Sequence, residues 1–268
     1  MNRIDKKFSE LKTQSRKAFI AYLTAGFPDL ETNLKLVAEM ERRGVDIVEL
    51  GVPFSDPIAD GPTIQASSQA ALERGTTFDD VLQLAARIRR SSQIPLVLMG
   101  YLNPFLSRPP EKLAADLARA GVDGVIVPDL PPEEADPIRR ALKKRGIHTI
   151  FLLAPTSPPE RIKLAAKKSG GFIYYVSMTG VTGGKAEISK ELKEKVREIK
   201  RAANLPVCVG FGISNREQLL EVWQSADGAI VGSALVKPFL ETRGKNRGLK
   251  QALQALDKLL GVEPGLRG

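Results

Sequence analysis

The sequence predicts an α/β fold in which eight parallel strands and the helices between them close into a (β/α)8 barrel. Three observations support this prediction: eight short apolar segments recur along the chain, amphipathic segments separate them, and the length of 268 residues fits one such barrel. A doubly wound open sheet is the alternative, but the turn after the first apolar segment lacks GxGxxG. We therefore expect one domain over residues 1–268, with a short N-terminal helix at about 2–15 and a frayed tail at about 262–268.

The eight apolar segments are rich in Val, Ile, Leu and Phe, with little polar alternation. Parallel strands that are buried on both faces have this composition. The expected strands lie at residues 18–24, 45–51, 95–101, 122–129, 147–155, 171–177, 206–212 and 228–234.

Segments with helical apolar spacing fill most of the intervals between these strands. The clearest of them lie at residues 30–44, 76–91, 110–121, 131–146, 158–170 and 215–226. Gly44, Gly121 and Gly146 each stand directly before a strand, which indicates helix C-caps. The interval after the second strand is longer, because it holds a loop at 51–65 and an extra segment of small residues at 66–75. Since loops after barrel strands carry the chemistry, this long loop is the first place to look.

Composition excludes several classes of protein. The chain carries a net charge of +9, but its basic residues are spread along it and only 6% of residues are aromatic, so solvated helix faces are favoured over a nucleic-acid surface. The charge could still attract an anionic substrate. One cysteine, Cys208, excludes a disulfide framework. No apolar run approaches the ~20 residues of a membrane span, and the N-terminus lacks the apolar stretch of a secretory signal, so we expect a cytoplasmic protein.

The residues that the sequence lacks narrow the possible chemistry. The only histidine, His148, starts the fifth strand, at the barrel end opposite to the chemistry, and no lysine lies within a predicted strand. Catalytic triads, histidine-rich metal sites and Schiff-base lysines are therefore disfavoured. Carboxylates remain, and Glu49 lies inside an apolar strand, where it is either catalytic or a paired structural acid. Asp56, Asp60 and Asp129 are further candidates, although each could simply organise a turn or cap a helix.

Glycine-rich turns follow the last three strands, at residues 177–185, 210–215 and 231–237. Any one of them could be an ordinary tight turn. Together, in a barrel, they favour a phosphate site with Gly212, Gly232 and Ser233 as the first donors to consider.

Several aromatic residues near the strand ends are candidates for the wall of a pocket. Tyr174 and Tyr175 are adjacent on one strand, so only one of them can face the barrel interior. Tyr22 and Phe211 lie at the ends of the first and seventh strands. As pocket walls, these side chains would suit a flat apolar ligand.

At residues 48–65 the sequence VELGVPFSDPIADGPTIQ resembles the signature of the tryptophan synthase alpha chain family. Other segments are similar to the family in the same order, and the resemblance covers essentially the whole chain. They are AYLTAGFPD, LMGYLNPF, VDGVIVPDLPPEEA, FLLAPTSPPERI, YYVSMTGVTG, VGFGIS and IVGSALVK. The resemblance implies a TIM-barrel lyase that cleaves indole-3-glycerol phosphate to indole and glyceraldehyde 3-phosphate without a metal.

The resemblance also implies roles for individual residues. Glu49 would be the acid–base residue, and Asp60 would accept a hydrogen bond from the indole N–H. Tyr175 would lie near the scissile bond, and Thr182 would belong to a loop that closes over the site. The implied substrate-binding residues are Tyr22, Tyr175, Thr182, Gly183, Gly184, Phe211, Gly212, Gly232 and Ser233.

The resemblance further implies a partner. The family works in an α2β2 assembly with a beta chain, which carries pyridoxal phosphate and joins indole to serine, so no cofactor is expected on this chain. Pro53 and Asp56 would lie at the partner interface. Three other readings stay open: a weakly active chain that mainly docks a beta partner, a basic RNA-binding protein, and a phosphosugar isomerase or aldolase on the same fold.

Overall fold

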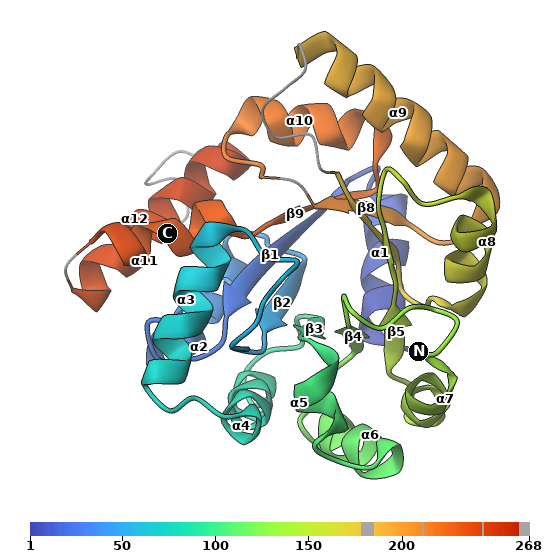
Figure 1. The fold of residues 1–268 in the computed structure, drawn as a ribbon. Coiled ribbons are helices and arrows are strands. Elements are labelled where there is room, and N and C mark those ends of the chain that lie inside the picture. Colours follow the sequence, from blue (N-terminus) through green and yellow to red (C-terminus); the bar gives the residue numbers. More distant parts are fainter. Residues whose placement is uncertain (178–184, 211, 243, 263–268) are drawn as a thin grey trace.

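The computed structural model describes residues 1–177, 185–210, 212–242 and 244–262, with the backbone alone for 185–189. All strand pairings in this part of the chain are parallel, and nine strands form one sheet in the order β5-β4-β3-β2-β1-β9-β8-β7-β6 (Figure 1). The strands are β1 Ala18–Thr24, β2 Ile47–Gly51, β3 Leu96–Met99, β4 Gly124–Ile126, β5 His148–Ile150, β6 Leu152–Leu153, β7 Ile173–Val176, β8 Val207–Gly210 and β9 Gly228–Val231.

The two ends of this strand order meet within one predicted strand, residues 147–155. Phe151 interrupts it and separates β5 from β6. The first half pairs with β4 and the second half with β7, and the amide of Tyr174 also donates to the Phe151 carbonyl at 3.2 Å. The sheet therefore closes on itself, and the predicted (β/α)8 barrel is confirmed with one of its eight strands broken.

Helices surround the sheet and follow the predicted pattern closely (Figure 1). They are α1 Arg3–Thr13, α2 Leu30–Arg42, α3 Pro62–Glu73, α4 Phe78–Arg89, α5 Leu102–Leu106, α6 Pro110–Arg119, α7 Asp136–Lys144, α8 Pro159–Lys168, α9 Lys185–Ala202, α10 Arg216–Ser225, α11 Ser233–Glu241 and α12 Lys245–Leu260. Two helix starts differ from the prediction by more than two residues. The extra segment in the long interval begins earlier, because Pro62 favours a first helical turn, and α7 starts only at Asp136, after a turn over 131–135.

The three predicted C-cap glycines follow helix ends in the structure. Gly44, Gly121 and Gly146 adopt φ angles of +89°, +76° and +71°, the left-handed conformation expected after a helix C-terminus. At the start of α2, the Asp29 side chain accepts a hydrogen bond from the Thr32 amide at 2.8 Å.

The N-terminal helix closes the barrel at the amino ends of the strands. Ile4, Phe8 and Leu11 of α1 pack into one apolar cluster with inward-facing strand residues and with the buried thiol of Cys208. His148 Nε2 lies 2.9 Å from the Asp5 carboxylate, so the only histidine fastens α1 to β5, as expected for a structural residue. The carboxyl ends of the strands stay open for a site. Among the described helices, none is long and apolar enough to cross a membrane.

Candidate active site

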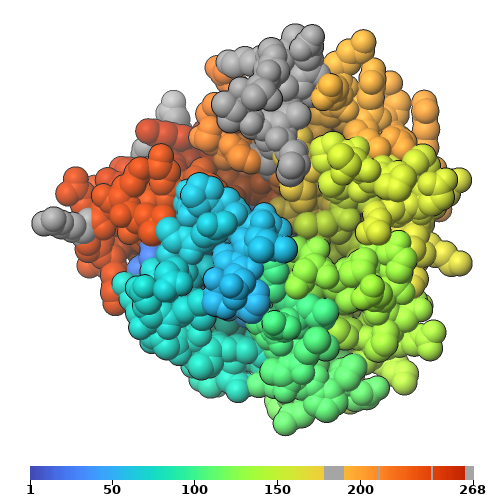
Figure 2. Space-filling model, in the orientation of Figure 1, coloured from blue at the N-terminus to red at the C-terminus, as the bar shows by residue number. Residues whose placement is uncertain are grey.

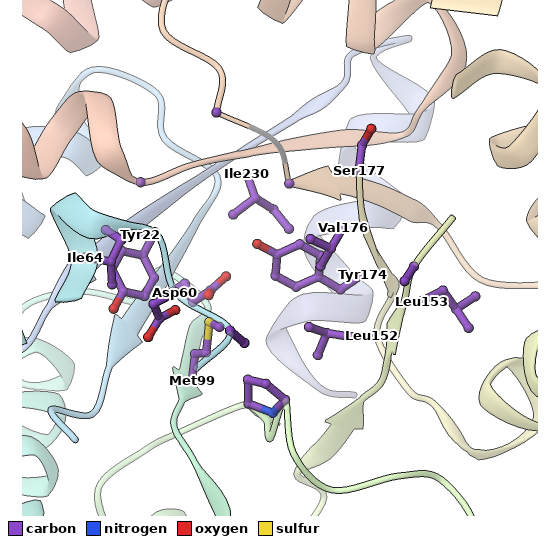
Figure 3. Close-up of a pocket in the computed structure, with 18 of the residues that line it drawn as sticks. Tyr22, Asp60, Ile64, Met99, Leu152, Leu153, Tyr174, Val176, Ser177 and Ile230 are labelled. Carbon is purple, nitrogen blue, oxygen red and sulfur yellow. The ribbon is translucent and has the colours of Figure 1, made fainter. Parts of the chain in front are cut away.

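A cavity of about 720 Å³ lies at the carboxyl ends of the barrel strands. Its walls come from β6, from the ends of β1, β2, β3, β7, β8 and β9 and from neighbouring loops, and Figure 3 looks into it. The segment after β2, sky-blue in Figure 2, lies at the middle of this face of the molecule. The long loop singled out from the sequence therefore contributes to the cavity, as predicted.

Glu49 is the buried acid of this cavity. It lies on β2 between Tyr22 of β1 and Val97 of β3 and has no solvent exposure. Neither of its carboxyl oxygens has a hydrogen-bond partner within the described residues. Burial, and secondarily the charge of Asp60, raises the pKa of Glu49 to about 8. A carboxyl group held in this way is protonated at neutral pH and can donate a proton.

Asp60 is the second carboxyl group of the cavity and comes from the loop after β2. Its Oδ2 accepts a hydrogen bond from the Tyr101 hydroxyl at 3.3 Å. The same hydroxyl accepts one from the Ala59 amide at 2.8 Å, and the Tyr101 ring stacks on Phe54. Burial raises the pKa of Asp60 to about 6, with the Tyr101 hydrogen bond opposing the rise. The two carboxyl groups thus have separated pKa values, as paired acid and base groups need.

Two tyrosines form facing walls of the cavity (Figure 3). A Cβ atom at Gly51 would overlap the Tyr22 ring, and one at Gly210 would overlap the Tyr174 ring. Glycine at both strand ends is therefore what allows the rings to lie there. Burial raises the pKa of both tyrosines, so their hydroxyls stay protonated.

The expectation that Tyr175 lines the site is wrong. Tyr175 is 3% exposed and packs in the outer core, toward Leu192 and Glu191 of α9, whereas its neighbour Tyr174 faces the cavity. Alternation along β7 sends the two side chains to opposite faces. Tyr174 is in register with Cys208, which belongs to the inner cluster. The sequence established the alternation but not the register, and the register decides which tyrosine faces inward.

Backbone groups line the far end of the cavity. Gly212 follows β8, and Gly232 and Ser233 stand at the N-terminus of α11. The first turn of a helix carries N–H groups without intrahelical partners, and these suit an anion. The structure therefore brings the predicted residues Gly212, Gly232, Ser233 and Tyr22 to the same cavity as the two carboxyl groups. Four predicted site residues lie outside the described part of the chain: Thr182, Gly183, Gly184 and Phe211.

The other two candidate aspartates, Asp129 and Asp56, make hydrogen bonds within their own loops or to a nearby helix start. Asp129 Oδ1 accepts a hydrogen bond from the Leu102 amide at 2.9 Å, at the start of α5. Asp56 accepts one from the Ser55 hydroxyl on the exposed loop. Pro53, by contrast, is buried within the chain itself. Among the described residues, no cluster of three or more His, Cys, Asp or Glu side chains could hold a metal ion.

Sequence reasoning missed Tyr101 and Arg161, among other residues of the site. Tyr101, which holds Asp60, ends the predicted third strand, and that position could have drawn attention to it. Arg161 of α8 is the one Lys or Arg side chain among the described residues lining the cavity, and its Nη2 lies 3.3 Å from Glu133. Nothing in the basic, amphipathic sequence of α8 distinguishes Arg161 from its neighbours.

A (β/α)8 barrel with two buried carboxyl groups and a helix N-terminus around one cavity is typical of enzymes that act on phosphorylated small molecules. The family model "Tryptophan synthase alpha chain" matches residues 8–262. The chain therefore belongs to the tryptophan synthase alpha chain family. The role of this family is to cleave indole-3-glycerol phosphate and pass indole to a beta subunit for tryptophan synthesis, so the chain is a lyase.

Individual relatives agree with this membership. The chain is 52% identical to the tryptophan synthase alpha chain of Geobacter sp. (strain M21) over 244 residues, which cover 91% of each chain. It is 44% identical to that of Thermoanaerobacter sp. (strain X514), covering 98% of this chain and all of the relative. Among solved structures, subunit alpha from Legionella pneumophila str. Paris superposes with a TM-score of 0.90 at 37% identity over 98% of both chains. A chain from the a2b2 complex of Pyrococcus furiosus reaches 0.85 at 39% identity, covering 91% and 98%.

Proposed function

We propose that Glu49 is the acid–base residue of the cleavage reaction and that Asp60 stabilises the positive charge that forms on the indole ring. One observation carries this proposal: two carboxyl groups with separated pKa values, about 8 and about 6, meet in a single cavity. Groups with these values are protonated and ionised, respectively, near neutral pH.

The reaction divides into two proton transfers. Protonated Glu49 gives its proton to C3 of the indole ring, which becomes a positively charged indolenine, and the ring N–H donates to the Asp60 carboxylate. The Glu49 carboxylate then takes the proton from the hydroxyl on the glycerol carbon next to the ring. The bond from that carbon to C3 breaks, its electron pair returns to the ring, and an aldehyde forms. Glu49 is thereby reprotonated, and the protonated ring supplies the electron sink that retro-aldol cleavage needs.

The remaining walls would bind the rest of the substrate. Tyr22 and Tyr174 would face the flat indole ring, since aromatic and apolar walls suit such a group. Gly212, Gly232 and Ser233 would bind the phosphate through backbone N–H groups. Thr182, Gly183, Gly184 and Phe211 remain part of this proposal on the strength of the resemblance. Arg161, which lies at the same cavity, adds a positive charge near an anionic substrate.

The pH dependence of cleavage tests the two carboxyl roles. Activity requires ionised Asp60 and protonated Glu49, so kcat/KM should rise as pH increases through about 6 and fall as it passes about 8. The measurement is the initial rate of indole formation at low substrate between pH 5 and 9, in buffers of constant ionic strength. A rate that stays flat up to pH 9 would remove the proposed proton donor.

The same proposal includes a beta-chain partner that carries pyridoxal phosphate and forms an α2β2 assembly in the cytoplasm. The loop after β2 supports a docking role, because Asp56 is exposed and Ile58 beside it is 85% exposed. Leu106 of α5, which follows β3 at the same barrel end, is 55% exposed. Exposed large apolar side chains at one face favour protein contact. Pro53, which is buried within the chain, would shape this loop at the partner interface.

Ile58→Asp tests the docking surface. We expect beta-chain affinity to fall by about tenfold or more, because a carboxylate would replace apolar contact area in the interface. Isothermal titration calorimetry with a beta chain measures this directly. Leu220→Asp is the matched control, since Leu220 is 44% exposed on α10, and it should leave the affinity unchanged. Equal affinity for the Ile58 variant and wild type would place the interface elsewhere.

A further inference from the structure

A band of basic side chains borders two adjoining hollows, away from the active site. The first, which we call the lower hollow, has a volume of about 780 Å³ and lies at the amino ends of β1, β8 and β9. Its edge carries Lys12, Arg16, Lys17 and Lys200. The outer groove, about 370 Å³, lies between α9 and α10 and is lined by Lys193, Arg197, Lys200, Arg201, Gln224 and Ser225. Lys200 belongs to both, so the two hollows form one basic track.

Three basic side chains of α9 lie in a row. Lys193, Arg197 and Arg201 follow one another at intervals of four residues and form a single row on the helix. A different hollow, on the side of Pro155 and Tyr175, is bordered by Glu191, Glu194 and Glu198 and by Lys195, which pairs with Glu198 at 2.9 Å. Like charges four residues apart lower helix stability, whereas mixed signs would raise it. Glu194 and Glu198, three residues before Arg197 and Arg201, offset part of this repulsion, and an anion bound along the row would relieve the rest.

The cations of this row are also left without acidic partners. Lys193, Arg197 and Arg201 form no ion pair with any described residue, and neither does Lys12. The acid at the lower hollow, Asp227, is already neutralised, because Lys200 lies 2.8 Å and Lys17 3.6 Å from its Oδ1. The track therefore carries an uncompensated positive charge.

The lining limits what the outer groove can accept. Its described residues are Lys, Arg, Gln and Ser, which offer hydrogen-bond donors, and none is aromatic, aliphatic or acidic. Single-stranded nucleic acid is usually bound with aromatic stacking and a membrane surface with apolar insertion, and the groove provides neither. A single phosphate would meet only part of the row, since Lys193 to Arg201 spans about 12 Å of helix.

We propose that this track binds a linear chain of phosphate groups, such as inorganic polyphosphate. Successive anionic oxygens would meet Lys193, Arg197 and Arg201 in turn and continue past Lys200 toward Lys12. Such binding is electrostatic and weakens steeply with salt. It is independent of the cleavage reaction, because none of these residues borders the active-site cavity.

The test compares two triple variants of the full chain. K193Q/R197Q/R201Q removes the row, and K143Q/K144Q/R145Q removes three exposed cations at the end of α7. Both lower the net charge from +9 to +6, that is 9 − 3. Fluorescently labelled long-chain polyphosphate is titrated by anisotropy at several salt concentrations, with poly-uridine RNA as a second probe. Circular dichroism and indole release, which both variants should retain, verify the fold.

For wild type we expect the logarithm of the association constant to fall with the logarithm of the salt concentration with a slope of about −2 to −3. Each of three or four contacted phosphates would contribute about −0.7 to this slope. The row variant should bind polyphosphate at least about tenfold more weakly and with a shallower slope, while the α7 variant should bind nearly as wild type. Equal losses in both variants would mean attraction to net charge alone and would overturn the proposal. Absence of polyphosphate binding, or tighter row-dependent binding of the RNA, would overturn it too.

Discussion

Glu49→Gln is expected to reduce indole release from indole-3-glycerol phosphate by about 10³-fold or more. Glutamine preserves the size of the side chain but cannot transfer a proton, and a positioned acid–base group contributes about 10²–10⁴-fold for each step it assists. The measurement is steady-state indole formation with a saturating beta chain. Glu217→Gln, an exposed change on α10, is the matched control and should retain wild-type activity. Activity within about tenfold of wild type would exclude the proposed role.

The same substitution should stabilise the fold at higher pH. The pKa of Glu49 is raised in the folded chain, so the folded state holds its proton from the ordinary value of 4.5 up to about 8, while the unfolded state loses it. Stability therefore falls as pH rises through this window, by roughly 1.4 kcal/mol per pH unit from this group. Glu49→Gln removes this loss of stability. The free energy of unfolding of the variant, measured with denaturant, should exceed that of wild type by almost nothing at pH 4.5 and by a growing amount toward pH 8. A pH-independent difference would contradict the raised pKa.

Asp60→Asn is expected to lower kcat by about 10²–10³-fold. The amide oxygen can still accept a hydrogen bond but has no charge to stabilise the indolenine, and loss of one such electrostatic group costs about this much. The variant should also lower the pKa of Glu49, because the Asp60 charge contributes to raising it. Carbon-13 NMR of the Glu49 carboxyl measures that shift without needing activity. Tyr101→Phe keeps the Asp60 carboxylate and removes only its hydrogen bond, so it should lower kcat by a smaller factor.

An unchanged kcat for Asp60→Asn would show that the ring charge is stabilised elsewhere. An unchanged Glu49 pKa in the same variant would show that the two carboxyl groups do not interact.

Much of the barrel followed from the sequence because buried parallel strands and C-capping glycines are local patterns. The eight predicted strands all exist, and Glu49 stands out because an acid inside a buried strand is costly. The break at Phe151 and the inward choice of Tyr174 were not predictable in the same way. Both depend on how neighbouring strands are placed beside one another, and that placement is a property of the closed sheet.

Contacts between side chains of different loops could not be predicted from the sequence either. Asp60 is more than forty positions from Tyr101 in the sequence, yet their side chains share a hydrogen bond. Arg161 lines the cavity although its helix, α8, has the sequence of an ordinary solvent-exposed helix. Such pairs form only once the barrel has placed the carboxyl ends of its strands around one cavity.

Indole release from indole-3-glycerol phosphate by the purified chain, alone and with a beta chain added, tests the central claim most directly. We predict slow release of indole and glyceraldehyde 3-phosphate in equal amounts by the chain alone, and a strong increase when the beta chain is present. A folded chain that releases no indole under either condition would contradict the proposed roles of Glu49 and Asp60 and leave only the barrel.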